Sequence, residues 1–317
     1  MPMNVAALLY VSDCPETFTA HGVLFRAPLP TDGRIARLLL DHVNGTGTPM
    51  RLMAGIVNVG AGPGTVSVLG GTGGPDANAM AVGHSASLQF FRSGEQVAIT
   101  HALAGGAAIP LVDLVLQPAQ CVAAIYDIDC GSGGGSYDIR VIACAPENDS
   151  LAVFDQLPVA PDDGKSRRGV FDIKGASAPT PITYDGAPAV FRLGAATFTR
   201  ADLDPYQGPD HRGEYGVLRR FACSLSGSGT VALYQSARAG EATATYWLDG
   251  TLLASHGIPA GPRSKIATYE LTEGQTRTFA LSTMAEINSS YPLELSFDTD
   301  NAQLANAGTP DSPVYEA

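Results

Sequence analysis

The sequence has few charged residues and very little lysine. Only 16% of its 317 residues are charged, against roughly 25% in ordinary soluble domains. All three lysines lie after residue 150, and 31 acidic residues outnumber 19 basic ones, which gives a net charge of −12. Binding to nucleic acid or to anionic lipid requires a basic surface. The composition therefore argues against both kinds of partner.

Long apolar runs are also missing. No stretch of 18 or more apolar residues occurs, so the sequence predicts no membrane-spanning helix. The apolar start, residues 1–10, lacks a basic region and a small-residue cleavage site. It is therefore a poor signal peptide.

Motifs for nucleophilic catalysis, phosphate binding and zinc binding are absent. The sequence has no Gly-x-Ser-x-Gly elbow, no phosphate-binding glycine loop followed by a helix, and no Cys-x-x-Cys pair. The glycine-rich runs 60–64 and 70–74 lie between expected strands and are interpreted as turns. These absences favour a protein that is not an enzyme, and apart from calcium no cofactor is expected.

What the sequence does contain is a series of short β-strand patterns bounded by Gly, Pro, Asn and Asp. Helical periodicity is nearly absent, and its nearest candidates are the short segments 34–40 and 199–203. The expected strands are 23–26, 36–43, 50–57, 65–69, 86–91, 96–101, 110–116, 120–128 and 137–143, then 189–193, 215–224, 230–236, 242–248, 252–256, 266–271, 276–283 and 293–297.

About eight or nine strands in each half, at 8–12-residue spacing, are typical of sandwiches or barrels. The sequence predicts an all-β fold of two tandem antiparallel β-sandwich domains, Ig-like or jelly-roll-like. The expected domains are residues 1–150 and 151–317, with a linker at about 146–168 and a flexible tail from about residue 300.

The two halves also resemble each other at an offset of about 155–180 residues. Segment 33–41 parallels 213–221, and both lead through a turn into another strand. Segments 110–116 and 120–128 parallel 265–271 and 275–283. These parallels predict an internal duplication of one sandwich.

Between two alternating strands, Asn58, Gly60 and Gly62 stand where a tight connection needs positive φ angles. This segment, 55–68, resembles the strand–turn–strand element of bacterial Ig-like surface modules. The resemblance covers about 14 of 317 residues. It implies an extracellular adhesive or spacer module and brings no catalytic residues. In the second half, residues 226–229 take the turn position instead.

Two of the five cysteines could face each other. If strands 120–128 and 137–144 form a hairpin, Cys121 lies opposite Cys144, within the range of a disulfide. Such a bridge would imply an oxidising compartment. The alternative is that both are buried free thiols that pack as small apolar side chains.

Three sets of residues are candidates for ligand chemistry. His42 and His84 could form a polar site if they converge with Asp41 or Asp76. In the loop 202–211, Asp202, Asp204 and Asp210 offer the oxygen ligands that calcium prefers. Asp127 and Asp129, beside the glycine run 131–135, are a weaker candidate of the same kind. Solvated acidic loops and scattered histidines are the alternative interpretation.

Aromatic side chains give one further candidate. Tyr246 and the single tryptophan, Trp247, run into a turn and could form an exposed platform for a glycan. A lone tryptophan in a sandwich is more often part of the core.

The function expected from these patterns is a non-catalytic structural, adhesive or assembly protein of a cell surface, virion or secreted apparatus. It would act through protein–protein contacts or self-assembly, for example by β-augmentation. A pair of carbohydrate-binding modules is the first alternative. A polysaccharide-active hydrolase or lyase that uses His42, His84 and the loop 202–210 is the second. An extracellular, envelope or virion location is favoured despite the poor signal peptide.

Overall fold

The computed structural model describes residues 5–132, 135–206 and 208–300, together with the backbone of residues 314–316. Within it the chain forms two compact units, and each has a hydrophobic core of its own. The first unit comprises Met1–Lys174 and Phe198–His211, and the second comprises Gly175–Thr197 and Arg212–Ala317.

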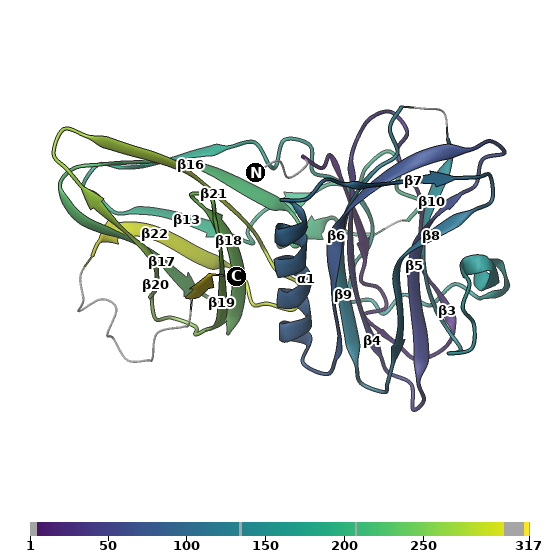
Figure 1. The fold of residues 1–317 in the computed structure, drawn as a ribbon. Coiled ribbons are helices and arrows are strands. Elements are labelled where there is room, and N and C mark those ends of the chain that lie inside the picture. The colour runs from purple at the N-terminus through teal and green to yellow at the C-terminus, as the bar shows by residue number, and fades with distance from the viewer. Residues whose placement is uncertain (1–4, 133–134, 207, 301–313, 317) are drawn as a thin grey trace. The chain divides into compact units, whose positions relative to one another are not determined.

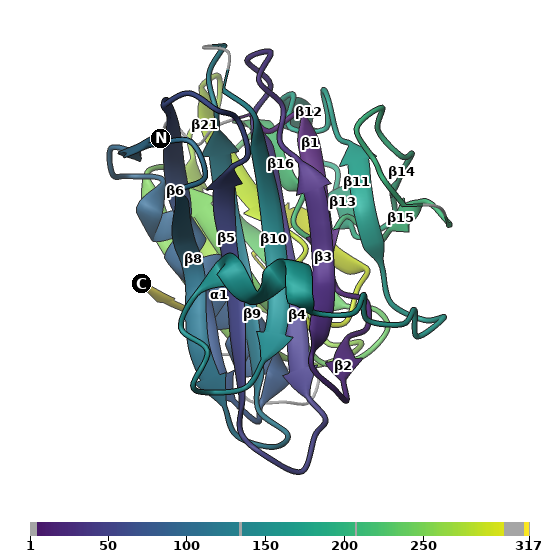
Figure 2. The ribbon, with the colours of Figure 1, turned by 90° about the vertical axis from the view of Figure 1, so that its right-hand side faces the viewer.

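The first unit is a sandwich of two β-sheets (Figure 1). Its strands are β1 (Leu8–Ser12), β2 (Thr17–Phe18), β3 (Gly22–Pro28), β4 (Ala36–Asn44), β5 (Met50–Asn58), β6 (Gly64–Asp76), β7 (Ile99–Leu103), β8 (Ala108–Leu116), β9 (Cys121–Asp129), β10 (Tyr137–Cys144) and β11 (Arg168–Asp172). One sheet has the order β3-β10-β5-β8 (Figure 2), and the other has the order β11-β1-β4-β9-β6-β7, with β2 paired to β4. The all-β class predicted from the sequence is confirmed.

Strands β3 to β10 have the order of a jelly roll. Strands β3, β5, β8 and β10 lie in one sheet, whereas β4, β6, β7 and β9 lie in the other. Most strands that are consecutive in the sequence therefore lie in opposite sheets. Of the two sandwich types that the sequence allowed, this order is that of the jelly roll.

The second unit repeats this strand order. Its strands are β12 (Thr180–Tyr184), β13 (Ala189–Leu193), β16 (Leu218–Ser226), β17 (Gly229–Ala237), β18 (Ala242–Leu248), β19 (Thr251–Ile258), β20 (Ser264–Leu271), β21 (Thr276–Met284), β22 (Leu293–Thr299) and β23 (Val314–Glu316). The sheets have the orders β13-β22-β17-β20 and β12-β16-β21-β18-β19-β23. In both units the first strand pairs in parallel, β1 with β4 and β12 with β16. Strands β14 (Thr197–Phe198) and β15 (His211–Arg212) form a separate two-stranded sheet.

The sequence parallels fall on equivalent strands of the two units. Segments 33–41 and 213–221 contain most of β4 and the start of β16, and segments 110–116 and 265–271 lie in β8 and β20. The units differ in one connection. Strands β6 and β7 are joined through helix α1 (Ala79–Ser93), whereas only residues 249 and 250 separate β18 from β19.

Helix α1 occupies the segment 86–91 that the sequence predicted as a strand, so this prediction is wrong. Asn78 caps the N-terminus of the helix, and its side chain accepts a hydrogen bond from the Ala81 N–H at 3.2 Å. Its buried residues include Val82, Ala86 and Phe90, which recur at the four-residue spacing of a helix. Many of the other residues of α1 are Ala, Ser or Gly, so the helical spacing of its apolar residues was not recognised in the sequence. At 15 residues α1 is the longer of the two helices in the described part of the chain, and neither could cross a membrane.

The glycine run 70–74 was predicted as a turn, and it lies within strand β6. Helix α1 packs on β6 and β9 (Figure 1). Gly71 and Gly73 let it approach closely, because a Cβ atom on either glycine would overlap the helix. The lack of side chains on this face of β6 is therefore a packing requirement.

The loop carrying the Ig-like resemblance also differs from expectation. Residues 59–63 join β5 to β6, which lie in different sheets and form no hairpin. Asn58, Gly60 and Gly62 are not among the residues with positive φ. The Asn58 side chain shapes the loop instead: its Oδ1 accepts from the Gly60 N–H at 3.0 Å, and its Nδ2 donates to the Gly62 carbonyl at 2.9 Å.

The segment expected as the linker, 146–168, belongs to the first unit. Its 3-10 helix η1 (Leu151–Gln156) buries Leu151 and Phe154 against β5 and β10 (Figure 2). The division between units thus lies further along the chain than the expected boundary at residue 150. The tail predicted as flexible lies outside the described residues, apart from Asp300 and strand β23.

Candidate functional site

Exposed apolar side chains gather at one edge of the first unit. Val97 and Ile99 are 91% and 65% exposed, and Val115 is 39% exposed. Ile99 lies in β7 and Val115 in β8, the end strands of the two sheets, which contact each other. We call this surface, made of β7, β8 and residues 96–98, the β7–β8 edge.

A groove of about 340 Å³ runs along the β7–β8 edge. Its base includes Tyr126, whose hydroxyl donates to the Leu111 carbonyl at 3.0 Å and lies 2.9 Å from the Thr72 hydroxyl. Burial raises the pKa of Tyr126, so this hydroxyl remains a donor. These two contacts hold the Tyr126 ring in place at the groove. It is lined by Val68, Leu69, Gly70, Ser93, Gln96, Val97, Ile99, His101, Pro110, Leu111 and Tyr126.

Other edge strands of the first unit are protected from pairing with further strands. The edge of β3 is covered by residues 158–160, where the Val23 N–H donates to the Pro158 carbonyl at 2.8 Å. The edge of β11 is covered by residues 199–201, where the Asp172 N–H donates to the Thr199 carbonyl at 2.9 Å. Strand β8 carries Pro110 and a bulge. Prolines, bulges and covering segments are common devices that block edge pairing.

Strand β7 has none of these devices. Its sequence from Ile99 to Leu103 contains no charged residue and no proline. Within the described residues its only strand partner is β6. An uncharged, exposed strand edge beside apolar side chains is a template for adding a further strand.

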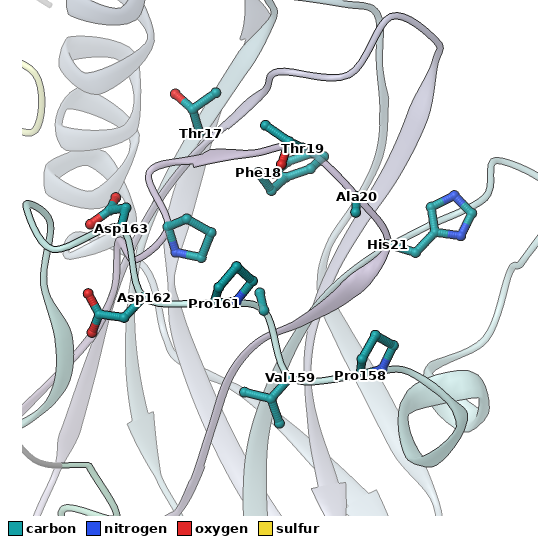
Figure 3. Close-up of a pocket in the computed structure, with 12 residues that line it drawn as sticks. Thr17, Phe18, Thr19, Ala20, His21, Pro158, Val159, Pro161, Asp162 and Asp163 are labelled. Carbon is teal, nitrogen blue, oxygen red and sulfur yellow. The ribbon is translucent and has the colours of Figure 1, made fainter.

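A second cavity, of about 390 Å³, lies between residues 15–21 and 158–163 of the first unit (Figure 3). Asp162 and Asp163 lie at one end of it and His21 at the other. The two walls are tied together by the Glu16 N–H, which donates to Asp163 at 3.0 Å. Side chains of proline, valine, alanine and phenylalanine make up much of the rest.

Asp163 has a structural role at this cavity, because its carboxylate accepts hydrogen bonds from the backbone of Glu16, Lys165 and Ser166. Burial alone would raise the pKa of Asp163, but the N–H groups of Ser166 and Lys165 outweigh it and hold this pKa well below its usual range. The Cys14 thiol lies 3.6 Å from Asp163, and burial raises its pKa to about 11. Cys14, Asp162 and Asp163 are close enough together to share a metal ion. A protonated thiol and a carboxylate already bound by four protein donors are poor ligands.

The acidic loop predicted as a calcium site is not assembled as one. Asp202 pairs with Arg34 at 2.9 Å. Asp204 pairs with Arg200 and accepts from the Val170 N–H at 3.0 Å. Asp210 is exposed. In the described part of the chain these carboxylates form no shared ligand set, and Asp202 and Asp204 are bound separately by different arginines.

The two histidines predicted to form a polar site do not converge. His42 lies 2.8 Å from the Ser12 hydroxyl and 2.9 Å from the Pro15 carbonyl, fully buried. His42 lies two residues after the core residue Leu40 on β4 and shares its face, so it points into the sandwich. His84 lies on helix α1, which packs on the opposite face of that sheet. Asp41 also projects to that opposite face, because neighbouring residues of a strand alternate.

The buried position of His42 predicts a pH-dependent stability. Burial lowers the pKa of His42 from 6.5 to about 4. Between these values the unfolded chain binds a proton that the folded chain does not, so the free energy of unfolding should fall as the pH decreases from 6.5 to 4. We expect His42→Gln to reduce this slope in urea titrations. An imidazole resonance of folded His42 that titrates near pH 6.5 would contradict the prediction.

The predicted aromatic platform is not exposed. Tyr246 is fully buried, and its hydroxyl donates to the Gln235 side chain at 2.7 Å. Trp247 is half-buried. As neighbours on β18 the two side chains project to opposite faces. They cannot stack on one sugar together.

The predicted Cys121–Cys144 disulfide is absent, and the free-thiol alternative describes all five cysteines. The expected hairpin does not form, because β9 pairs with β4 and β6 whereas β10 pairs with β3 and β5 in the other sheet. Burial raises the pKa of both Cys121 and Cys144 to about 11. The thiols are buried and protonated.

The β7–β8 edge was not among the sites predicted from sequence. A strand at 96–101 was expected, and its lack of charge was visible, but nothing in the pattern showed that it would end a sheet. Edge position depends on which strands pair, and that is set by tertiary contacts.

Comparisons with known proteins add no family. No protein-family model and no curated protein matches the sequence. Among solved structures, the chain is similar to the PBSX exported protein XepA, with 11% identity over 88% of this chain and 85% of that chain and a TM-score of 0.19. It is also similar to the N-terminal CBM22-1–CBM22-2 tandem of Paenibacillus barcinonensis Xyn10C, with 12% identity, coverages of 87% and 79%, and a TM-score of 0.16.

Proposed function

We propose that this chain is a non-catalytic assembly or adhesion protein that acts through protein–protein contacts along its β7–β8 edge. The observation that carries the proposal is the unprotected edge of β7 beside the exposed Val97 and Ile99. An open strand edge can pair with other chains and cause aggregation, and the first unit protects its edges at β3, β11 and β8 while leaving the edge of β7 open. The setting we propose is a cell surface, virion or secreted apparatus.

The alternatives have less support from the arrangement of side chains. A glycan platform at Tyr246 is hindered because that ring is buried. The hydrolase or lyase alternative relied on His42, His84 and the loop 202–210. His42, Asp202 and Asp204 are held by hydrogen bonds and ion pairs within the protein, and His84 lies on α1, away from His42.

The proposal is tested with Ile99→Lys, which places a charge on the open edge without disturbing the core. Self-association is measured by sedimentation velocity, and partner capture is measured with extracts of the source cells. We expect the wild type to associate with itself or to retain a protein partner, and Ile99→Lys to lose that association.

The matched control is Val190→Lys, on strand β13 of the second unit, where the valine is also exposed. It should behave as the wild type does. If no association depends on Ile99, or if both variants lose it equally, the β7–β8 edge is not the interaction surface.

A further inference from the structure

The shared strand order makes β7 and β19 equivalent positions. In the first unit β7 lies next to β6 in the sheet, and in the second unit β19 lies next to β18, which is the equivalent of β6. A segment that pairs with the outer edge of one of these strands therefore indicates which kind of segment could pair with the outer edge of the other.

The outer side of β19 accepts a strand from the end of the same chain. Strand β23 pairs with it antiparallel, with Ala254 opposite Tyr315 and Ser255 opposite Val314. No equivalent strand covers β7 in the described residues, where β7 pairs with β6 only. The first unit thus has the same edge without its covering strand.

The chemistry of the β7–β8 edge suits this occupant. The groove along it is lined mainly by apolar side chains and contains no carboxylate. Because neighbouring side chains of a strand alternate, an added strand would turn either Tyr315 or the pair Val314 and Glu316 toward the groove, and neither arrangement brings two carboxylates together there.

We infer that β7 binds the C-terminal strand, residues 314–316, of a second copy of this chain. This inference rests on the proposed function and names the partner. The 13 residues 301–313 could span up to about 45 Å when extended, which gives the C-terminal segment reach beyond its own β19. Because the strand and its receptor are different surfaces, the contact is head-to-tail and propagates into open oligomers or a ring.

The test counts binding sites for a synthetic peptide of residues 308–317. It is titrated into the isotope-labelled full chain, and the backbone amide shifts of β7 and of residues 253–255 are followed by NMR. We expect one site on the full chain, at β7. A chain ending at Asp300 should show two sites, because its β19 is vacated. Ile99→Lys should weaken the β7 site at least about tenfold, or by 1.4 kcal/mol.

Controls separate this inference from the proposed function. A peptide with Tyr315→Pro, which lacks the N–H of a paired strand, should not bind, and Val190→Lys should leave both sites unchanged. If the peptide binds only at residues 253–255 of the shortened chain, the inference is wrong. The proposed function would then still hold if a captured partner is lost with Ile99→Lys.

Discussion

Replacing Asp127 with alanine is expected to destabilise the first unit by about 3–5 kcal/mol, the usual cost of leaving a buried charge without its partner. Asp127 and Arg37 face each other on β9 and β4, and both side chains are fully buried. Arg37 donates from Nε at 2.7 Å and from Nη2 at 3.0 Å to the two carboxylate oxygens. The Phe90 ring of helix α1 covers the guanidinium at 4.7 Å. Without Asp127, the buried guanidinium would lose both of these charge-assisted hydrogen bonds.

The measurement is urea unfolding followed by hydrogen exchange and mass spectrometry, because two units need not unfold in one step. Peptides from β4 and β9 should lose protection at lower urea in Asp127→Ala, whereas peptides from β21 serve as an internal control. The double variant Arg37→Met, Asp127→Leu should recover most of the lost stability, because both charged groups of the buried pair are then replaced by apolar side chains. Arg192→Ala, which breaks an exposed ion pair with Glu294, should have a small effect. If Asp127→Ala lowers the free energy of unfolding as little as Arg192→Ala does, the buried ion pair does not stabilise the first unit.

From the sequence, Asp127 and Asp129 were a weaker candidate for calcium binding, whereas in the structure Asp127 is paired with Arg37. Asp127 and Asp129 lie just before the glycine run 131–135, which is the local pattern of a cation loop. Asp127 and Asp129 are two residues apart in β9, so their side chains lie on the same face of the sheet. At Asp127 this face is covered by Arg37 of β4 and Phe90 of α1. The partner, Arg37, is 90 residues away. Local spacing carries no information about such a pairing.

Strand patterns were the part of the fold that could be predicted. Alternation and turn residues are local signals, and they located most strands of both jelly rolls, as well as the parallels between the halves. Strand pairing was not predictable in the same way. The expected Cys121–Cys144 hairpin assumed that strands consecutive in sequence are partners, which is the commoner case. A jelly roll sends β9 and β10 to opposite sheets.

The β7–β8 edge could not be predicted for the same reason, because it depends on which strands pair in the folded protein. The sequence predicted a strand at 96–101 without showing that it ends a sheet, and it predicted a strand where helix α1 lies. Glycines were interpreted as turn residues because Gly commonly supplies positive φ. Gly71 and Gly73 serve a different purpose, which is to leave room for the helix on the sheet.

Replacing Gly73 with alanine is therefore expected to destabilise the first unit by about 1–3 kcal/mol, the usual cost of overpacking. A Cβ atom at this position would overlap the Val82 carbonyl oxygen and lie 2.8 Å from the Ala86 nitrogen. Both contacts are with helix backbone, which cannot rotate away as a flexible side chain could. The helix would have to move off β6, and its contacts with β9 would loosen as well.

Hydrogen exchange should show this directly as faster exchange of the amides of α1 in Gly73→Ala. Gly47→Ala is the matched control, because no atom lies within 4 Å of a Cβ atom built there. Alanine at that position should leave stability unchanged or raise it slightly through the entropy of the unfolded chain. Equal stability of the two variants would mean that α1 tolerates displacement, and that the glycines of β6 are not what fixes it. Because α1 leads directly into residues 94–98 and β7, a displaced helix should also alter peptide binding at the β7–β8 edge, whereas Gly47→Ala should not.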